Sequence, residues 1–289
     1  MGGRTFIMKK IKISCADFTF PLLPHDKALD LIAMLDCEGV DIGLFTGRSH
    51  IQAEGEFSAL EKNAKLLHKK ASDRGLMIAD IYLQLDNDLA KFAINHPDAD
   101  KRRFARAQFL KLIEYAQYAQ AEHITCLPGM AFPEIESPED SVQRSYEELN
   151  WRVEQAGKTD LSFSIEAHVG SPYTKPADVL TLVKSVPGLY ITLDYTHFIR
   201  NGYSQQETEI LLPYANHFHA RGAKAGRLQS SVAENIIDYG KIVRQLKAGN
   251  FEGWIGLEYI WIKWEQCNEA DTLSETILLR DIILKSIQK

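Results

Sequence analysis

Four short segments in the second half of the chain decide the fold: Leu161-Ser162-Phe163-Ser164-Ile165-Glu166, Leu189-Tyr190-Ile191-Thr192-Leu193-Asp194, Asn216-His217-Phe218-His219-Ala220 and Trp254-Ile255-Gly256-Leu257-Glu258-Tyr259. Each is a run of apolar and β-branched residues of strand length, and each carries an acidic residue or a histidine near its end. Four more runs of this kind occupy residues 11–16, 40–45, 77–83 and 123–127. The eight runs predict eight β-strands.

Stretches with helical spacing separate these runs, at residues 27–37, 57–72, 101–119, 141–155, 177–184, 237–246 and 272–287. The segment Ser137-Pro138-Glu139-Asp140 is typical of a helix start, with a capping serine, a first-turn proline and acidic residues. The alternation predicts an α/β protein, a (β/α)8 TIM barrel. A doubly wound sheet is the alternative, but Asp17-Phe18-Thr19-Phe20-Pro21 follows the first strand where a G-x-G-x-x-G turn would be expected.

Composition narrows the class of protein further. The 289 residues contain no linker or low-complexity tract, so we expect one domain over residues 1–289, with residues 1–8 outside the fold. The net charge of −6 disfavours a nucleic-acid partner, and no apolar run approaches the ~18 residues of a membrane span. The four cysteines are isolated, and the N-terminus lacks a signal sequence. These features predict a soluble cytoplasmic protein.

The candidate site lies at the ends of the last four predicted strands. In a (β/α)8 barrel functional residues gather at the C-terminal ends of strands, and neighbouring strands lie about 4.8 Å apart. Glu166, Asp194, His219 and Glu258 should therefore converge. Three carboxylates so placed would repel one another without a cation, and an oxygen-rich set with one imidazole suits Mn²⁺, Mg²⁺, Co²⁺ or Zn²⁺. The pattern predicts one divalent metal ion.

Such a site suits proton transfer next to a carbonyl group. Isomerising or epimerising a sugar requires a proton to leave the carbon beside the carbonyl and to return, through an enediolate. A divalent ion with two places left for substrate oxygens would stabilise that charge, and two carboxylates could serve as base and acid.

Four motifs carry a family resemblance: Ser164-Ile165-Glu166-Ala167-His168, Leu193-Asp194-Tyr195-Thr196-His197-Phe198, His217-Phe218-His219-Ala220-Arg221 and Gly256-Leu257-Glu258-Tyr259. Together they resemble the xylose isomerase-like TIM barrel superfamily, in its sugar phosphate isomerase/epimerase branch, over essentially the whole chain. The resemblance implies that Glu166, Asp194, His219 and Glu258 hold the metal, with Glu166 and Glu258 also acting as acid and base. It further implies that His197 contacts substrate or a second metal and that Arg221 or Arg227 binds substrate oxygens.

Other residues near the strand ends allow two interpretations each. His168 follows Glu166 by two residues, so it points to the same side and contacts either substrate or a ligand carboxylate. His217 lies one layer deeper than His219 and is interpreted as a structural residue or as one that supports a ligand residue from behind. Aromatic residues after the first and last strands could wall a sugar or pack the rim. They are Phe18, Phe20, Trp261 and Trp264.

Three other functions remain as alternatives to a sugar isomerase or epimerase. A keto-polyol dehydratase could use the same residues, because dehydration begins with the same proton abstraction. An abasic-site endonuclease of the same superfamily would need further histidine ligands, but residues 124–129 contain none and no histidine follows His219. A non-catalytic sugar-binding barrel would not need two opposed carboxylates. The expected partner is a small sugar or polyol, and a homo-oligomer is compatible with the sequence.

Overall fold

Eight parallel strands close into one barrel, in the order of the sequence. The computed structural model describes residues 11–289, so the expectation for residues 1–8 lies outside the described part. Each strand pairs with its sequence neighbours, and β1 pairs with β8 to close the barrel. The strands are β1 (Ile11–Ala16), β2 (Gly39–Phe45), β3 (Met77–Gln84), β4 (His123–Cys126), β5 (Ser162–Ile165), β6 (Tyr190–Asp194), β7 (Ala215–Ala220) and β8 (Gly253–Leu257). The predicted (β/α)8 barrel is confirmed.

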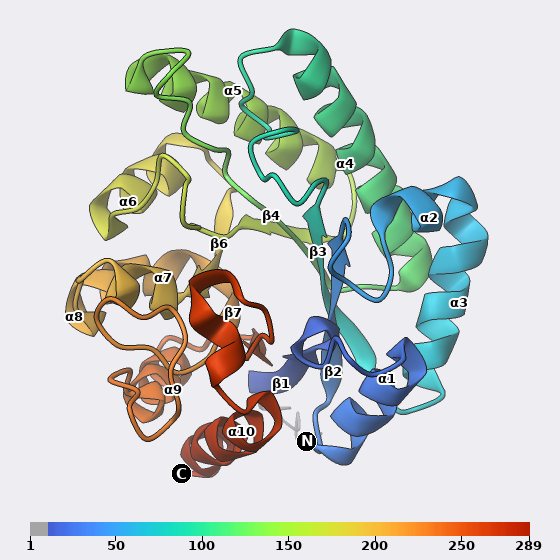
Figure 1. The fold of residues 1–289 in the computed structure, drawn as a ribbon, viewed down its shortest axis with the longest axis vertical. Helices are drawn as coiled ribbons and strands as arrows, with labels where there is room; N and C mark the ends of the chain where they lie inside the picture. The colour runs from blue at the N-terminus through green and yellow to red at the C-terminus, as the bar shows by residue number, and fades with distance from the viewer. Residues whose placement is uncertain (1–10) are drawn as a thin grey trace, which may run out of the picture.

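Helices encircle this barrel (Figure 1). They are α1 (His25–Met34), α2 (Ala53–Ser58), α3 (Leu60–Ser72), α4 (Ala99–Ala119), α5 (Pro138–Ala156), α6 (Pro176–Ser185), α7 (Tyr195–Arg200), α8 (Gln205–Thr208), α9 (Tyr239–Ala248) and α10 (Thr272–Gln288). Three short 3-10 helices add η1 (Asp17–Thr19), η2 (Glu209–Tyr214) and η3 (Trp264–Glu269). The start of α5 is as predicted, because the Ser137 side chain accepts a hydrogen bond from the backbone N–H of Asp140.

Two helical segments differ from the sequence prediction. The expected helix over residues 57–72 begins earlier and is broken at Ala59, whose φ of −139° and ψ of 56° separate α2 from α3. After β6 the chain enters α7 directly at Tyr195, with the Asp194 carboxylate capping the helix through the Thr196 N–H. The hydrogen bond at the start of α7 therefore fixes the side chain of Asp194, which is the last residue of β6 and one of the predicted site residues.

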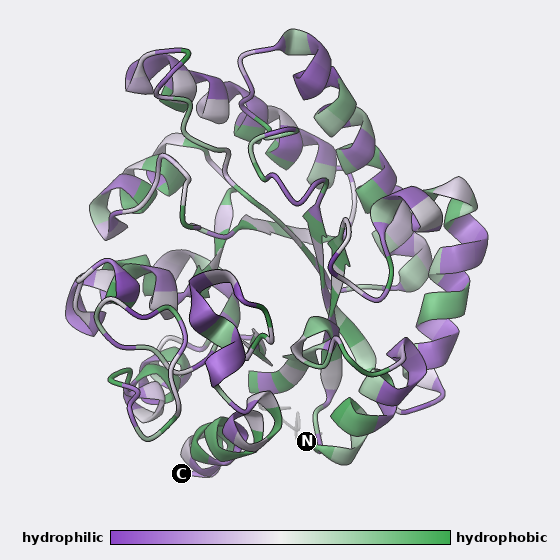
Figure 2. Cartoon of the chain, in the orientation of Figure 1, coloured by the Kyte–Doolittle hydropathy of each residue, from purple (hydrophilic) through white to green (hydrophobic). Residues whose placement is uncertain are grey.

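The outer faces of the strands are apolar and the barrel interior is partly polar. Outward side chains pack with the inner faces of the helices into one large hydrophobic core, and the helices in Figure 2 accordingly show green and purple sides. Inside the barrel, hydroxyl groups from three strands bond to one another: Thr125 Oγ1 lies 2.7 Å from Thr192 Oγ1, and Ser164 Oγ lies 2.5 Å from the same atom. This layer forms a hydrogen-bonded floor beneath the strand ends.

The barrel interior is tightly packed between β2 and β8, the two strands that pair with β1. A Cβ atom at Gly256 would collide with the Asp41 carboxylate, so only glycine allows that carboxylate to occupy its buried position. The same carboxylate lies 3.1 Å from Nε2 of His217. His217 is thus held inside the barrel, as expected for a structural residue.

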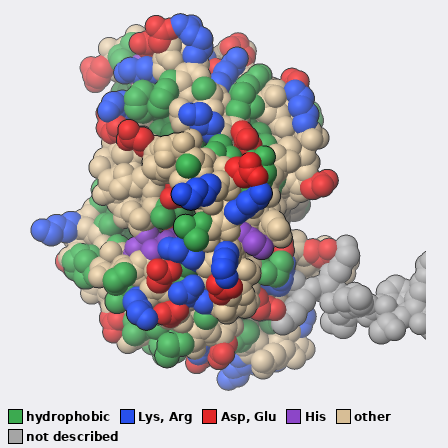
Figure 3. Space-filling view, turned by 90° about the vertical axis from the view of Figure 1, so that its right-hand side faces the viewer, with side chains coloured by type: hydrophobic (Ala, Val, Ile, Leu, Met, Phe, Trp, Pro, Cys, Tyr) green, Lys and Arg blue, Asp and Glu red, His purple; other side chains and the backbone are tan. Residues whose placement is uncertain are grey.

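The surface is mixed in charge on the face drawn in Figure 3, where Lys and Arg side chains alternate with Asp and Glu. Among residues 11–289, none of the helices combines the length and the apolar character that crossing a membrane requires.

Candidate active site

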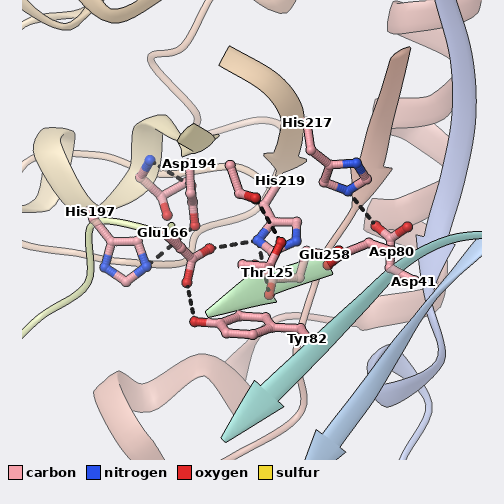
Figure 4. Close-up of polar contacts among 12 residues, drawn as sticks. Asp41, Asp80, Tyr82, Thr125, Glu166, Asp194, His197, His217, His219 and Glu258 are labelled. Atoms are coloured by element: carbon pink, nitrogen blue, oxygen red, sulfur yellow. Dashed lines mark hydrogen bonds and ion pairs between the residues drawn. The ribbon is translucent and has the colours of Figure 1, made fainter. Parts of the chain in front are cut away.

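The four residues predicted to bind metal lie at the C-terminal end of the barrel, on four consecutive strands (Figure 4). Asp194 ends β6 and His219 lies within β7, whereas Glu166 and Glu258 each follow the last residue of their strand, β5 and β8. All four side chains are buried, with at most 5% of each residue exposed. The barrel geometry therefore brings together side chains that are far apart in sequence, as predicted.

Three of the four residues share one cluster. His219 Nδ1 lies 2.5 Å from Glu166 Oε1 and 3.6 Å from Glu258 Oε1. The ligand-type atoms of these three residues all lie within 4.8 Å of one another. His219 is therefore the centre of the cluster and lies between Glu166 and Glu258.

Asp194 lies outside this cluster, because its carboxylate accepts hydrogen bonds from the start of a helix and from an arginine. Its Oδ1 accepts the Thr196 N–H at 2.8 Å, and its Oδ2 accepts from Nη2 of Arg221 at 2.6 Å. Arg221 is itself buried and also lies 3.2 Å from Glu258 Oε2 through Nη1. The guanidinium thus links Asp194 to the cluster and supplies positive charge there. His197 completes this side, with Nε2 3.4 Å from Asp194 Oδ2.

Burial and neighbouring charges shift the pKa values of Glu166 and Glu258 in opposite directions. Burial alone would raise the pKa of Glu166, but the His219 ring beside it lowers that pKa to about 2. Burial raises the pKa of Glu258 to about 7, and the attraction of His219 and Arg221 only partly offsets it. Burial disfavours a charged His219, yet Glu258 and Glu166 raise the pKa of its ring well above the usual range. The cluster therefore holds more carboxylate than one imidazole can neutralise.

The donor set fits a divalent cation. Glu166, His219 and Glu258 offer two carboxylates and one imidazole, a set that suits Mn²⁺, Mg²⁺ or Zn²⁺. Within residues 11–289, the buried Nε2 of His219 has no hydrogen-bond partner, and Oε2 of Glu258 has only its ion pair with Arg221. A second group, Glu166 with His168 and His197, also has its ligand-type atoms within 4.8 Å of one another. Glu166 is common to both groups.

A cavity of about 520 Å³, including its mouth open to solvent, lies above the cluster. Four predicted site residues line it, namely Glu166, Glu258, His168 and Arg221. The other four, Asp194, His219, His197 and Arg227, are not part of its lining. Phe18 and Trp264 line the cavity, whereas Phe20 and Trp261 do not. Aromatic walls and a charged floor give the cavity the character of a small-molecule site.

His168 forms part of the wall. Its Nδ1 lies 2.9 Å from the carbonyl oxygen of Val169, and its ring stacks on Trp264 at a centroid distance of 5.4 Å. Burial lowers the pKa of His168, so a neutral ring faces the cavity. Arg227 lies elsewhere, because its guanidinium donates to Glu269 Oε2 at 2.6 Å beside η3. Of the two arginines considered for substrate oxygens, Arg221 is the one that faces the cavity.

Three polar lining residues, Arg48, Tyr82 and Gln84, were not anticipated from the sequence. The Tyr82 hydroxyl donates to Glu166 Oε2 at 2.8 Å, and Arg48 donates to the side-chain oxygen of Gln84 at the cavity edge. The Gly47-Arg48-Ser49 loop after β2 was the available signal for Arg48, because it is a basic residue just past a strand end. Tyr82 lies inside an apolar strand, where its sequence position carries no such signal.

The barrel and its cluster of acids and histidines define a (β/α)8 protein with a candidate site at the C-terminal ends of its strands. Residues 29–281 match the family model described as xylose isomerase-like TIM barrel, and the chain belongs to this family. No curated protein matches the sequence at a significant level.

Solved structures with the same fold include a D-psicose 3-epimerase with D-tagatose from Clostridium cellulolyticum H10, with a TM-score of 0.76 and 14% identity over 96% of this chain and 99% of that one. The probable 3-DHS dehydratase AsbF from Bacillus anthracis has a TM-score of 0.70 and 18% identity, covering 94% and 99%. A xylose isomerase-like TIM barrel protein from Mycobacterium smegmatis in complex with magnesium has a TM-score of 0.72 and 15% identity, covering 96% of each chain.

Proposed function

We propose that this protein is a divalent-metal-dependent isomerase or epimerase of a ketose or a related polyhydroxy carbonyl compound. The observation that carries the proposal is the position of Glu166 and Glu258, two buried carboxylates that line one cavity with His219 between them. Proton transfer at a carbon atom needs a base and an acid that reach the same small volume. The likeness to a solved sugar epimerase supports the choice of substrate class.

The chain's own residues account for proton transfer and positioning. One glutamate removes the proton from the carbon beside the carbonyl, and the other returns a proton to the neighbouring carbon or to the opposite face. Tyr82 fixes the Glu166 carboxylate through its 2.8 Å hydrogen bond. Arg221 faces the cavity from beside Glu258, where its guanidinium can donate to a substrate oxygen.

Glu166, Asp194, His219 and Glu258 are the residues that would hold the metal. When bound, a divalent ion supplies Lewis-acid stabilisation of the negative charge that develops on adjacent substrate oxygens. The aromatic wall of Phe18 and Trp264 suits the C–H faces of a sugar and keeps bulk water from the floor.

The test is a proton NMR assay in D₂O with the Mn²⁺-loaded protein and a panel of free and phosphorylated ketoses, keto-sugars and keto-inositols. We expect deuterium to enter the carbon beside the carbonyl of one panel member, together with an isomeric product. Loss of water to give an unsaturated product would instead identify a dehydratase. Cleavage of an abasic-site DNA duplex without turnover of any panel member would overturn the proposal.

A further inference from the structure

A second cavity, of about 510 Å³ including its mouth open to solvent, lies on the outer side of the barrel wall. Tyr82 of β3 faces the barrel interior, so the next residue, Leu83, faces outward, and the cavity lies on its side of the strand. Gln84, at the end of β3, lines both cavities and separates them. The second cavity is mainly apolar, and its walls include Leu83, Ile94, Ala105, Phe109, Cys126 and Met130.

One buried cation lines this apolar space. Arg152 of α5 is 1% exposed, and its Nη1 donates to Glu148 at 2.8 Å to Oε2 and 3.0 Å to the carbonyl oxygen. Its guanidinium also lies over the ring of Phe109, 5.3 Å from the centroid. Nε and Nη2 have no hydrogen-bond acceptor within residues 11–289. Two unsatisfied donors on a buried charge are costly, and a bound acceptor would remove that cost.

Within the described part of the chain, Glu148 is the only carboxylate that pairs with Arg152. It also pairs with two other arginines. Glu148 Oε2 also accepts from Nε of Arg106 at 3.0 Å, and Glu148 Oε1 lies 3.6 Å from Nε of Arg102. One negative charge therefore faces three guanidinium groups between α4 and α5. Arg102 and Arg106 reach Glu148 from partly exposed positions, so Arg152 is the one guanidinium of the three that lines the cavity.

We propose that this cavity binds a small organic monocarboxylate with an apolar body, whose two oxygens accept from Nε and Nη2 of Arg152. The paired N–H groups of a guanidinium match the two oxygens of a carboxylate, and the apolar walls match the body. The other charged lining residues are Asp86 and Asp88, whose negative charge opposes an anion and so restricts the ligand to a single carboxylate held at Arg152. Asp86 is already satisfied by Lys91 Nζ at 2.7 Å and by the Asp88 N–H at 3.1 Å. This site is separate from the proposed reaction and does not depend on it.

The proposal is tested by titrating the purified full chain with hexanoate, hexanol and hexylamine, followed by NMR of the tryptophan indole groups. We expect hexanoate to bind about tenfold or more tightly than hexanol, the effect of hydrogen bonds to a charged group, and hexylamine not to bind. The signal of Trp151, whose ring contacts Arg152, should shift, whereas that of Trp264 in the other cavity should not. Equal binding of hexanoate and hexanol would overturn the proposal.

Two variants locate the site, and a third variant serves as the control. Arg152→Met removes the charge, and Ala105→Leu fills the cavity without changing charge, so each should weaken hexanoate binding at least about tenfold. Arg103→Gln removes an exposed charge from the same helix as Ala105 and should leave binding unchanged. If Arg152→Met fails to fold, the Ala105 variant and the three-ligand comparison decide. Binding that survives Ala105→Leu would place hexanoate elsewhere on the protein. Failure of hexanoate, butanoate and benzoate all to bind would mean that the cavity takes no carboxylate, and either result overturns the proposal.

Discussion

Nη2 of Arg221 lies 2.6 Å from Oδ2 of Asp194, with both side chains buried. Asp194 is one of the four residues predicted to hold a metal ion, so its carboxylate already has a cationic partner within the protein. Arg221 also reaches Glu258, 3.2 Å away. The guanidinium therefore compensates part of the negative charge that a metal ion would otherwise neutralise.

Arg221→Gln should destabilise the metal-free protein by about 3 kcal/mol or more, because it leaves buried carboxylates without their partner. Mn²⁺ should then raise the melting temperature more in the variant than in the wild type, since the ion restores the missing charge. Thermal denaturation in EDTA and in Mn²⁺ measures both effects. Arg244→Gln, at an exposed arginine, is the matched control. Equal stability of the Arg221 variant and the wild type in EDTA would contradict this role.

We predict one Mn²⁺ per chain, bound by Glu166, Asp194, His219 and Glu258. Glu166→Gln, His219→Gln, Glu258→Gln and Asp194→Asn should each lower the affinity at least about tenfold, because each removes a ligand or its charge. Calorimetric titration gives the affinity, and anomalous scattering from Mn²⁺ gives the position. The Asp194 variant is the most informative. Wild-type affinity in Asp194→Asn would restrict the ligands to the other three residues and assign Asp194 to Arg221 alone.

Glu166→Gln and Glu258→Gln should each reduce turnover by about 10² or more at saturating metal, because each loses a proton-transfer group. His217→Gln should cost much less, since His217 bonds to Asp41 inside the barrel and does not line the cavity. Glu154→Gln, at an exposed glutamate on α5, controls for the substitution itself. Steady-state rates with the substrate identified by the NMR panel provide the measurement. Near-normal turnover in either glutamate variant would remove that residue from the reaction.

Tyr82→Phe should lower metal affinity or turnover by about 10- to 100-fold, the usual effect of losing a hydrogen bond that orients a ligand. The hydroxyl donates to Glu166 Oε2, and the ring packs against Phe45 and His219, so phenylalanine keeps the packing and removes only the hydrogen bond. Calorimetry and turnover measured on the same preparation separate the two effects. Tyr118→Phe on α4 is the control. If Tyr82→Phe matches the wild type in both measurements, Glu166 is oriented by other contacts.

The sequence was sufficient to predict the strands and to predict which strand-end residues would lie close together. Apolar runs predicted all eight strands to within about two residues at each end, because both the interior and the outer faces of a barrel strand are buried. The topology then determined that Glu166 and Glu258 would converge. No repeat pattern indicated the break at Ala59, which depends on local backbone angles.

Contacts between particular side chains were harder to predict from the sequence than the positions of the strands. The hydrogen bond from Tyr82 to Glu166 joins residues 84 positions apart. The apolar pattern of the strand does not indicate whether the Tyr82 side chain points into the barrel or outward. Arg102 and Arg106 are spaced like a solvated helix face, yet both approach the buried Glu148 of the next helix. Such contacts depend on rotamers and on helix packing, which sequence spacing does not specify.

We predict that acid destabilises the fold through His123, a buried residue beneath the candidate site. Its Nδ1 lies 2.7 Å from Asp80 Oδ1, its Nε2 lies 2.8 Å from Ser164 Oγ, and its ring stacks on His217. Burial lowers the pKa of His123 below its ordinary value, although Asp80 partly offsets the effect. The folded state therefore holds a neutral ring. Burial opposes a charged Asp80, but His123 lowers the pKa of that carboxyl overall.

Unfolding releases the His123 ring to an ordinary pKa of about 6.5, so the unfolded chain binds an extra proton as the pH falls through that value. The stability due to neutral His123 is present above about pH 6.5 and is lost progressively below it. The contribution of Asp80 is lost only near its unfolded pKa of about 3.9, outside this window. His219 has a raised pKa and contributes with the opposite sign, but it does so equally in wild type and variant. We therefore expect the metal-free wild type to lose more stability than His123→Gln between pH 7.5 and 5.5. Urea denaturation in EDTA at pH 7.5, 6.5 and 5.5 measures the difference, and parallel pH dependences would show that His123 does not take up the proton.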